Sequence, residues 1–161
     1  MEVVGQLRVE VVYRRDHARL WRSLLAFTGD PDLASDAEAE AFAQVLRRGE
    51  AVDDVAAWVW RSAFRIAIGL LGAARSHDEF VRRLSEDSRI EPSHAEFLAL
   101  LGSLSQQQRA CVVLRYTGGF TSEEIAQLIG SSAGTVRVQL HRAHATLRAE
   151  LDPNEIERRL G

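Results

Sequence analysis

The sequence predicts an all-α protein made of two small helical domains joined by a polar linker. Apolar residues recur at helical spacing along most of its 161 positions, and the alternation typical of strands is hard to find. Prolines are scarce: Pro31, Pro92 and Pro153. Apolar residues make up 46% of the chain and charged residues 27%, a balance typical of folded domains.

The first 75 residues predict three helices, over about 7–27, 32–48 and 53–74. The first has an apolar stripe that begins with Leu7 and Val11. Glycine and proline in the Thr28–Asp32 segment separate it from the second. The third is apolar nearly all round, which predicts burial on two sides or a face offered to a partner. We therefore expect a partner or the other domain to cover its stripe of Trp60, Phe64 and Leu71.

Residues 76–93 are polar and acidic, with five acidic residues against three arginines, and are predicted to link a domain over 1–75 to one over 94–161. A short helix within the linker is possible at Phe80, Val81 and Leu84. After it, a short apolar helix over about 96–101 is expected.

The C-terminal domain carries the pattern of a helix-turn-helix. Ser105 with Gln108, and Thr121 with Glu124, form capping boxes that begin two helices. Gly130 permits the left-handed backbone of a tight turn between helices. Ser132 is a suitable N-cap for a last helix over about 133–151. We expect Ile125, Ile129, Val136 and Leu140 to point inward and fix the angle between the two helices.

The second helix of such a motif enters the major groove of DNA through its N-terminal residues. From 133 to 149 it has three arginines and no acid, and an ordinary helical hairpin with a solvated basic face is the alternative. Arg137 suits guanine and Gln139 suits adenine, whereas Arg142, further along, suits phosphate. Ser132 and Thr135 complete the predicted DNA contacts.

The sequence gives little support for an enzyme, a membrane or secreted protein, or a metal-binding protein. The net charge of −3 disfavours nucleic-acid binding by bulk charge, and the single Cys111 fits a reducing cytoplasm and a place in the core. We find no signal peptide, no membrane-length apolar run and no catalytic constellation, and we expect neither an enzyme nor a cofactor. His141 and His144 have metal-capable spacing, but no third ligand lies one turn away.

Residues Leu100 to Leu151 resemble domain 4 of the extracytoplasmic-function (ECF) group of sigma-70 family sigma factors. The N-terminal half resembles domain 2 of the same group. The domain 4 resemblance rests on the segments Leu104–Ala110, Val113–Tyr116, Thr121–Gly130, Gly134–Arg137 and Leu140–Ala143. The looser domain 2 resemblance rests on Tyr13–Leu20, Thr28–Asp30, Leu33–Asp36, Glu40–Phe42 and Ala57–Trp58.

The resemblance implies a factor that binds core RNA polymerase, directs it to promoters and helps to open the DNA. Domain 4 would bind the upstream promoter element and rest on the β-flap. Domain 2 would dock on the β′ clamp helices and capture a flipped base. An anti-sigma protein would hold the factor inactive. The implied strand-binding residues are Trp60, Arg61, Phe64 and Arg65, and the implied polymerase-binding residues are Asp36, Glu40, Phe42 and Arg47.

The chain also departs from the pattern of this family. Ala39 stands where the clamp-binding helix usually has Gln, and the third helix has Arg65, Gly69 and Gly72 among positions that are often polar or basic. Trp58, Trp60 and Phe64 could each stack on unpaired bases or pack in the core. Two alternatives therefore stay open: a sigma-like regulator with a weakened domain 2 that acts through a protein partner, and a free-standing helix-turn-helix regulator.

Overall fold

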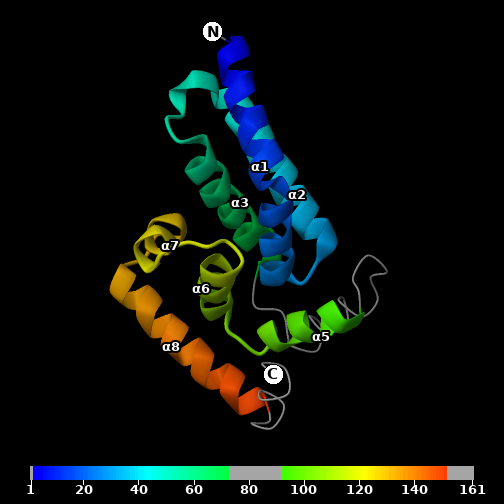
Figure 1. Ribbon diagram of the computed structural model, residues 1–161, viewed down its shortest axis with the longest axis vertical. Helices are drawn as coiled ribbons and strands as arrows, with labels where there is room; N and C mark the ends of the chain where they lie inside the picture. Colours follow the sequence, from blue (N-terminus) through cyan, green and yellow to red (C-terminus); the bar gives the residue numbers. More distant parts are fainter. Residues whose placement is uncertain (1, 73–91, 152–161) are drawn as a thin grey trace.

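The computed structural model describes residues 2–72 and 92–151, which are helical with short connections and contain no strand (Figure 1). This confirms the predicted all-α class. The elements in chain order are α1 (Glu2–Thr28), α2 (Pro31–Arg48), the 3-10 turn η1 (Gly49–Ala51), α3 (Val55–Leu71), α5 (Pro92–Leu101), α6 (Gln106–Tyr116), α7 (Ser122–Ile129) and α8 (Ala133–Glu150).

In the N-terminal half, α1 and α2 form a hairpin, and α3 packs against both (Figure 1). The hairpin turns at Asp30, whose side chain accepts hydrogen bonds from the backbone N–H groups of Asp32 and Leu33 and so caps α2. Arg8 of α1 donates to the carbonyl oxygens of Val52 and Asp53, at 2.7 and 2.6 Å. These bonds hold the loop before α3 against α1.

The buried face of α1 differs from the predicted stripe. Leu7 and Val11 are exposed, whereas Val9, Val12 and Asp16 are buried. The helix also begins at Glu2, earlier than predicted. The prediction was wrong because the true inner face includes a carboxylate, Asp16, and a pattern of apolar residues does not register a buried charge.

The C-terminal half confirms the predicted helix-turn-helix. Both capping boxes are formed, from Ser105 to Gln108 at the start of α6 and from Thr121 to Glu124 at the start of α7. Gly130 ends α7 in the left-handed conformation, with φ 69° and ψ 43°. Ser132 caps α8. Of the four residues expected inside the motif, two are fully buried and two are half-buried: Ile125 and Val136, then Ile129 and Leu140.

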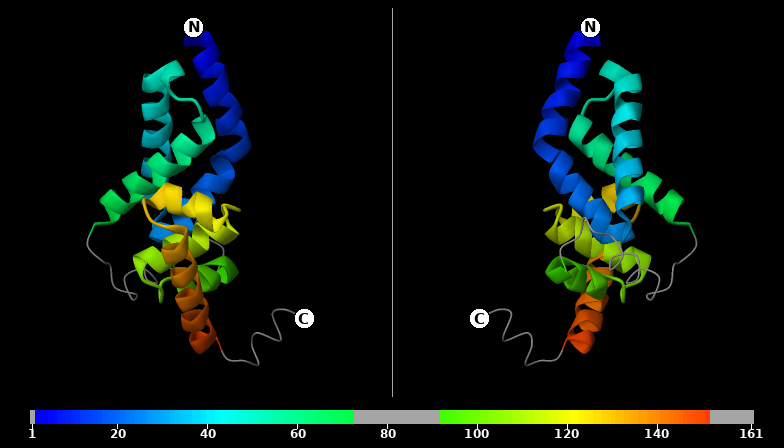
Figure 2. Two further views of the ribbon diagram at one scale, coloured as in Figure 1. Left: turned by 90° about the vertical axis from the view of Figure 1, so that its left-hand side faces the viewer. Right: turned by 90° about the vertical axis from the view of Figure 1, so that its right-hand side faces the viewer.

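The two halves pack against each other. Helix α6 lies against α1, and α7 lies against α3, as Figures 1 and 2 show from three sides. The buried apolar residues of both halves form one cluster. The predicted stripe on α3 is buried: Phe120 of the other half meets Trp60, and Phe27 of α1 meets Phe64.

The predicted linker lies mostly outside the described residues, as do the possible helix at Phe80, Val81 and Leu84 and the end of the predicted third helix. Helix α5 begins at Pro92, so residues 92 and 93 belong to a helix rather than to the linker. The division into domains 1–75 and 94–161 stays a prediction.

Two glycines give a matched test of this backbone. A Cβ added at Gly130 or at Gly69 would meet no atom within 4 Å, but Gly130 has a positive φ and Gly69 lies within α3. We expect Gly130→Ala to lower the free energy of unfolding by about 1 kcal/mol. We expect Gly69→Ala to raise it by about 0.5–1 kcal/mol. Urea unfolding of both variants measures the two signs, and a shared sign would contradict the assigned turn.

Candidate nucleic-acid interface

The packing of α8 decides which of its side chains face outward. Val136 and Ala143 are buried, and Leu140 and Leu147 pack beside them against α6 and α7. The opposite side of the helix is exposed, and its residues recur at intervals of three and four positions. They are Thr135, Val138, Arg142 and Ala145, with His141 beside them.

Ser132 and Thr135, two of the predicted DNA-contacting residues, form the N-cap of α8. The Ser132 hydroxyl accepts a hydrogen bond from the backbone N–H of Thr135 at 3.1 Å and donates to the Thr135 hydroxyl at 2.9 Å. Both residues are exposed. The capping bonds fix their positions, and the backbone N–H groups at this helix start are oriented as phosphate contacts require.

Arg137 and Gln139, the predicted base-reading residues, differ in accessibility. The Arg137 guanidinium is exposed and lies 3.2 Å from the Glu123 carboxylate of α7. Gln139 is half-buried and donates to the side chain of Gln107 on α6 at 3.1 Å. In this structure the Gln139 side chain points toward α6 rather than outward, and its contact with a base stays a prediction. Its spacing from Val136 and Ala143 already placed it on their side of the helix.

The sequence analysis missed Val138 and His141 as members of the outward face. Both are exposed, and Val138 lies between Thr135 and Arg142 on the outward stripe. A signal for them was available, because the buried positions define an inner face and these two residues lie opposite to it. Arg142 and Arg148 have no acidic partner among the described residues, so the unpaired positive charge of α8 lies on this side.

On α3, the structure corrects two of the four predicted strand-binding residues. Trp60 and Phe64 are each 1% exposed, so neither ring is available to stack on a base in this conformation. Arg61 and Arg65 are exposed, as a DNA-contacting role requires. The sequence left stacking and packing equally open for the two aromatics, and tertiary packing buries both.

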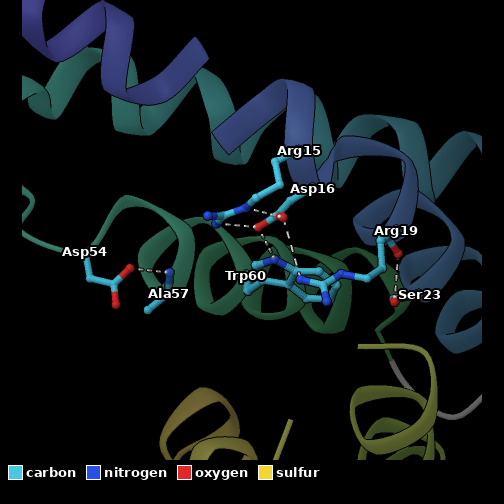
Figure 3. Close-up of polar contacts among 7 residues, drawn as sticks. All are labelled: Arg15, Asp16, Arg19, Ser23, Asp54, Ala57 and Trp60. Carbon is cyan, nitrogen blue, oxygen red and sulfur yellow. Dashed lines mark hydrogen bonds and ion pairs between the residues drawn. The ribbon is translucent and has the colours of Figure 1, made fainter. Parts of the chain in front are cut away.

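Trp60 is held by a buried carboxylate on α1 (Figure 3). The indole N–H of Trp60 donates to Asp16 at 3.4 Å, and the guanidinium of Arg15 donates to the same carboxylate at 2.8 Å. Burial by itself would raise the pKa of Asp16, but the bonds from Arg15 and Trp60 and the charges of Arg15 and Arg19 outweigh it and hold the pKa below its ordinary value.

The Trp60 ring makes two further contacts. The guanidinium carbon of Arg19 lies 5.1 Å from the ring centroid, within the range of a cation–π interaction. Phe120, in the loop before α7, meets the same ring edge to face at 5.0 Å. Trp60 therefore connects α1, α3 and the C-terminal half.

A different aromatic of α3 faces the surface. Trp58 is half-buried and shares a side of the helix with Arg61 and Arg65, at spacings of three and four. Arg48 lies 5.9 Å from the Trp58 ring centroid. Arg48, Trp58 and Arg61 border a surface hollow of about 220 Å³ that also includes two acidic residues, Asp53 and Asp54, the second of which is the N-cap of α3. A ring, two arginines and a hollow form a surface suited to an unpaired base.

Of the predicted polymerase-binding residues on α2, three are exposed and one is buried. Asp36, Glu40 and Arg47 are exposed, and Arg47 lies 3.1 Å from Glu40. Bonds from Gln44 and Arg47 lower the pKa of Glu40. Phe42 is 7% exposed and meets Tyr13 of α1 edge to face at 5.0 Å, so it is a core residue rather than a contact surface.

Glu38 is a buried acid on α2. Its Oε1 lies 3.0 Å from Nδ1 of His17, while its Oε2 is buried without a hydrogen-bond partner among the described residues. Burial raises the pKa of Glu38, although the bond and charge of His17 oppose this effect. The residue supports the packing of α1 on α2 at a cost in desolvation.

The histidine and cysteine side chains considered as metal or redox sites make contacts within the fold. His144 lies 2.8 Å from the Tyr116 hydroxyl, which links α8 to α6. No group of three metal-ligating side chains occurs within the two described stretches. Cys111 is fully buried, as expected, and burial raises the pKa of its thiol to about 11. No described helix is long and apolar enough to span a bilayer.

Comparison with known proteins covers both halves. Residues 94–147 match the family described as Sigma-70, region 4. The chain is 32% identical over 161 residues to the RNA polymerase sigma-E factor of Streptomyces antibioticus, covering 95% of this chain and 89% of that protein. The chain belongs to the ECF group of sigma-70 family sigma factors.

Other sigma factors match over a similar extent. The RNA polymerase sigma-E factor of Streptomyces coelicolor is 30% identical over 161 residues, covering 95% of this chain and 91% of that protein. The ECF RNA polymerase sigma factor SigL of Mycobacterium tuberculosis is 29% identical over 158 residues, covering 89% and 88%. In this sigma factor the matched region 4 corresponds to α5 through the first four turns of α8.

Glu38 gives a test of how this sigma factor is stabilised. A raised folded-state pKa means that the contribution of Glu38 to stability is present below its unfolded pKa and is lost as pH rises through its folded pKa. At neutral pH the ionised, buried carboxylate is therefore unfavourable. We expect Glu38→Met to raise the free energy of unfolding at pH 7 by about 1 kcal/mol, because it removes a buried acceptor that lacks a partner.

The control is Glu40→Gln on the same helix. The pKa of Glu40 shifts in the opposite direction and its carboxylate is exposed, so its loss should cause a small decrease in stability at pH 7. Denaturant unfolding between pH 5 and pH 7 measures both variants. A Glu38→Met protein that is less stable than wild type at pH 7 would contradict this assignment.

Proposed function

We propose that this chain directs core RNA polymerase to promoters through two separate DNA contacts, one in each half. The observation that supports this most strongly is the outward face of α8: a capped helix in a helix-turn-helix whose unpaired arginines lie opposite its buried side. The relatives that match across both halves are named as RNA polymerase sigma factors. That extent disfavours a free-standing helix-turn-helix regulator.

In the C-terminal half, α8 enters the major groove of an upstream promoter element. Arg137 meets a base edge, and Glu123 positions it until DNA replaces the ion pair. Arg142 contacts phosphate, and the methyl groups of Val138 lie on the same face for apolar contact with a thymine methyl. Ser132 and Thr135 present the helix start to the backbone.

In the N-terminal half, α3 binds the strand that leaves the duplex. Trp58 provides a ring for an unpaired base, and Arg48 and Arg61 provide charge around the hollow. Arg65 is exposed on the same helix and adds positive charge. This assignment replaces Trp60 and Phe64, which are buried. Accordingly, the departures from the family pattern along α3 do not remove every stacking group from domain 2.

For the polymerase, we propose the exposed side of α2 as the surface that meets the β′ clamp helices, through Asp36, Glu40 and Arg47. The C-terminal half rests on the β-flap. The proposal of an anti-sigma protein as a further partner is based on the family resemblance alone. The apolar stripe of α3 does not require such a partner, because it is already buried within the chain.

DNA recognition by α8 is tested with two arginine variants in the holoenzyme. Arg137→Ala should relax selection at one base pair and cost about 1–3 kcal/mol there. Arg142→Ala should weaken binding to all upstream sequences alike and reduce the slope of log affinity against log salt by about one. The measurement is a titration of upstream-element duplexes at several salt concentrations.

The control for these variants is Arg22→Ala, an exposed arginine on α1. It should change neither the selection of bases nor the dependence of binding on salt. Gln139→Ala should also leave base selection unchanged, since its amide is bonded to Gln107. Altered selection with Gln139→Ala would restore Gln139 as a base contact, and unchanged selection with Arg137→Ala would remove Arg137.

The function as a whole is tested by run-off transcription with purified core polymerase. Product that depends on this chain supports the proposal; binding to core without product favours the alternative of a sigma-like regulator. We expect Asp36→Ala to weaken core binding by about 1 kcal/mol, roughly fivefold, through loss of an exposed charge pair. Glu10→Ala, an exposed acid on α1, is the control and should bind core like wild type.

A further inference from the structure

A short loop forms one wall of the hollow beside Trp58. The hollow lies between the end of α2, at Arg48, the loop 51–54 and the first turns of α3. The two helical walls have regular backbone hydrogen bonds. The turn that leads into the loop closes through a long bond, 3.5 Å from the N–H of Val52 to the carbonyl oxygen of Gly49. The position of the loop therefore depends on contacts from outside it.

Arg8 of α1 supplies such a contact. One nitrogen of its guanidinium, Nη2, donates to the carbonyl oxygens of both Val52 and Asp53, at 2.7 and 2.6 Å. Hydrogen bonds from a charged donor are stronger than those from a neutral one. Gly5, one turn earlier, is buried, and a Cβ there would lie 3.7 to 3.8 Å from three atoms of η1. The first turns of α1 therefore hold the loop and the turn before it.

The loop in turn determines the position of Trp58. Asp54 follows the two bonded carbonyl groups and caps α3, because its side chain accepts a hydrogen bond from the backbone N–H of Ala57 at 3.0 Å (Figure 3). Its carbonyl oxygen accepts from the backbone N–H of Trp58, also at 3.0 Å. The Trp58 ring thus leaves the helix within one turn of the residues that Arg8 holds. A shift of the loop would move this ring relative to Arg48, 5.9 Å from its centroid.

Arg8 does not border the hollow that contains Trp58. It lines a separate hollow of about 490 Å³ on the α1 side of the loop, which shares Asp53 and Asp54 with the first. The bonds of its guanidinium run to the backbone of the loop. Its effect on the Trp58 hollow is therefore exerted through the loop rather than by contact with a strand bound there.

We propose that Arg8 is a positioning residue for binding of the unpaired strand: its two bonds to Val52 and Asp53 hold the loop so that the hollow beside Trp58 is formed before the strand arrives. This inference rests on the proposed role of Trp58. A site that is already formed binds more tightly, because no binding free energy is used to order it. Apparent affinity falls with the fraction of chain in which the loop is in place.

The contact between Arg8 and the loop is tested in the free chain by amide hydrogen exchange. Arg8→Met keeps a long side chain and removes both bonds. Exchange at Val52, Ala57 and Trp58, whose N–H groups bond within the loop and the cap, should become about tenfold faster, since the loss of a bond to a charged donor corresponds to at least that factor. Unchanged exchange would overturn the inference.

Strand binding is tested in the holoenzyme with forked DNA. The probe is the upstream duplex of the run-off template carrying an unpaired tail, compared with the same duplex without the tail, and the ratio of affinities is the gain from the tail. Arg8→Met should lower this gain about threefold to tenfold, as expected if the loop is in place for about a third to a tenth of the time. The slope of log affinity against log salt should not change. Arg61→Met should reduce that slope by roughly 0.7, the value for one phosphate of a single strand.

Two further variants control for charge and for folding. Arg14→Met replaces an exposed arginine of α1 that bonds Glu10 of the same helix, and it should change neither exchange nor the gain. Arg8→Lys keeps the charge and donor groups on a different side chain and should be intermediate in both measurements. It decides the result if Arg8→Met does not fold: wild-type gain with faster exchange in Arg8→Lys would overturn the inference.

The outcomes separate this inference from the proposed function. Faster exchange in Arg8→Met with an unchanged gain overturns the positioning role and leaves the proposed function intact. A gain that falls together with the salt slope means that Arg8 itself touches a phosphate, which also overturns the positioning role. If Trp58→Ala keeps the full gain, the proposed strand-binding site fails and the positioning role fails with it.

Discussion

The arrangement of this sigma factor depends on the contacts of Trp60. Its indole is bonded to a carboxylate on α1, covered by Arg19 and met by Phe120 from the C-terminal half. Because one buried ring contacts three parts of the chain, the angle of α3 on the hairpin and the position of the helix-turn-helix are coupled. The Asp16 carboxylate fixes the ring in turn, which explains why an acid is buried in an otherwise apolar face.

The side chains of α3 are of two kinds, those that pack inside the molecule and those that face the surface. The residues that hold the molecule together point toward α1 and α7, and the residues available to DNA point away from them. Trp58, Arg61 and Arg65 belong to the second group. The same division occurs on α8, where Val136 and Ala143 face inward and Arg142 faces outward. In each helix the contact surface is what remains after the core has been packed.

The seam between the halves differs in character from the core of either half. Within a half, helices pack through aliphatic and aromatic side chains; across the seam this apolar packing continues, and a guanidinium and two backbone carbonyls take part as well. Such contacts gain less from exclusion of water than aliphatic packing does, and lose less on hydration. The two halves therefore pack as one body through apolar, polar and cationic contacts together.

The sequence by itself determined the helices of the C-terminal half, the turn at Gly130 and the caps at Ser105, Thr121 and Ser132, because each depends on residues within four positions along the chain. It also placed the outward arginines of α8. Only the tertiary structure decided that Trp60 is buried while Trp58 faces the surface, that Glu38 is inside, and that Gln139 turns toward α6. The burial of Glu38 and Trp60 depends on partners 21 and 60 positions away, His17 and Phe120, and the local pattern of apolar residues carries no information about them. The spacing of Gln139 placed it on the inner side of α8, but its bond depends on Gln107, 32 positions away.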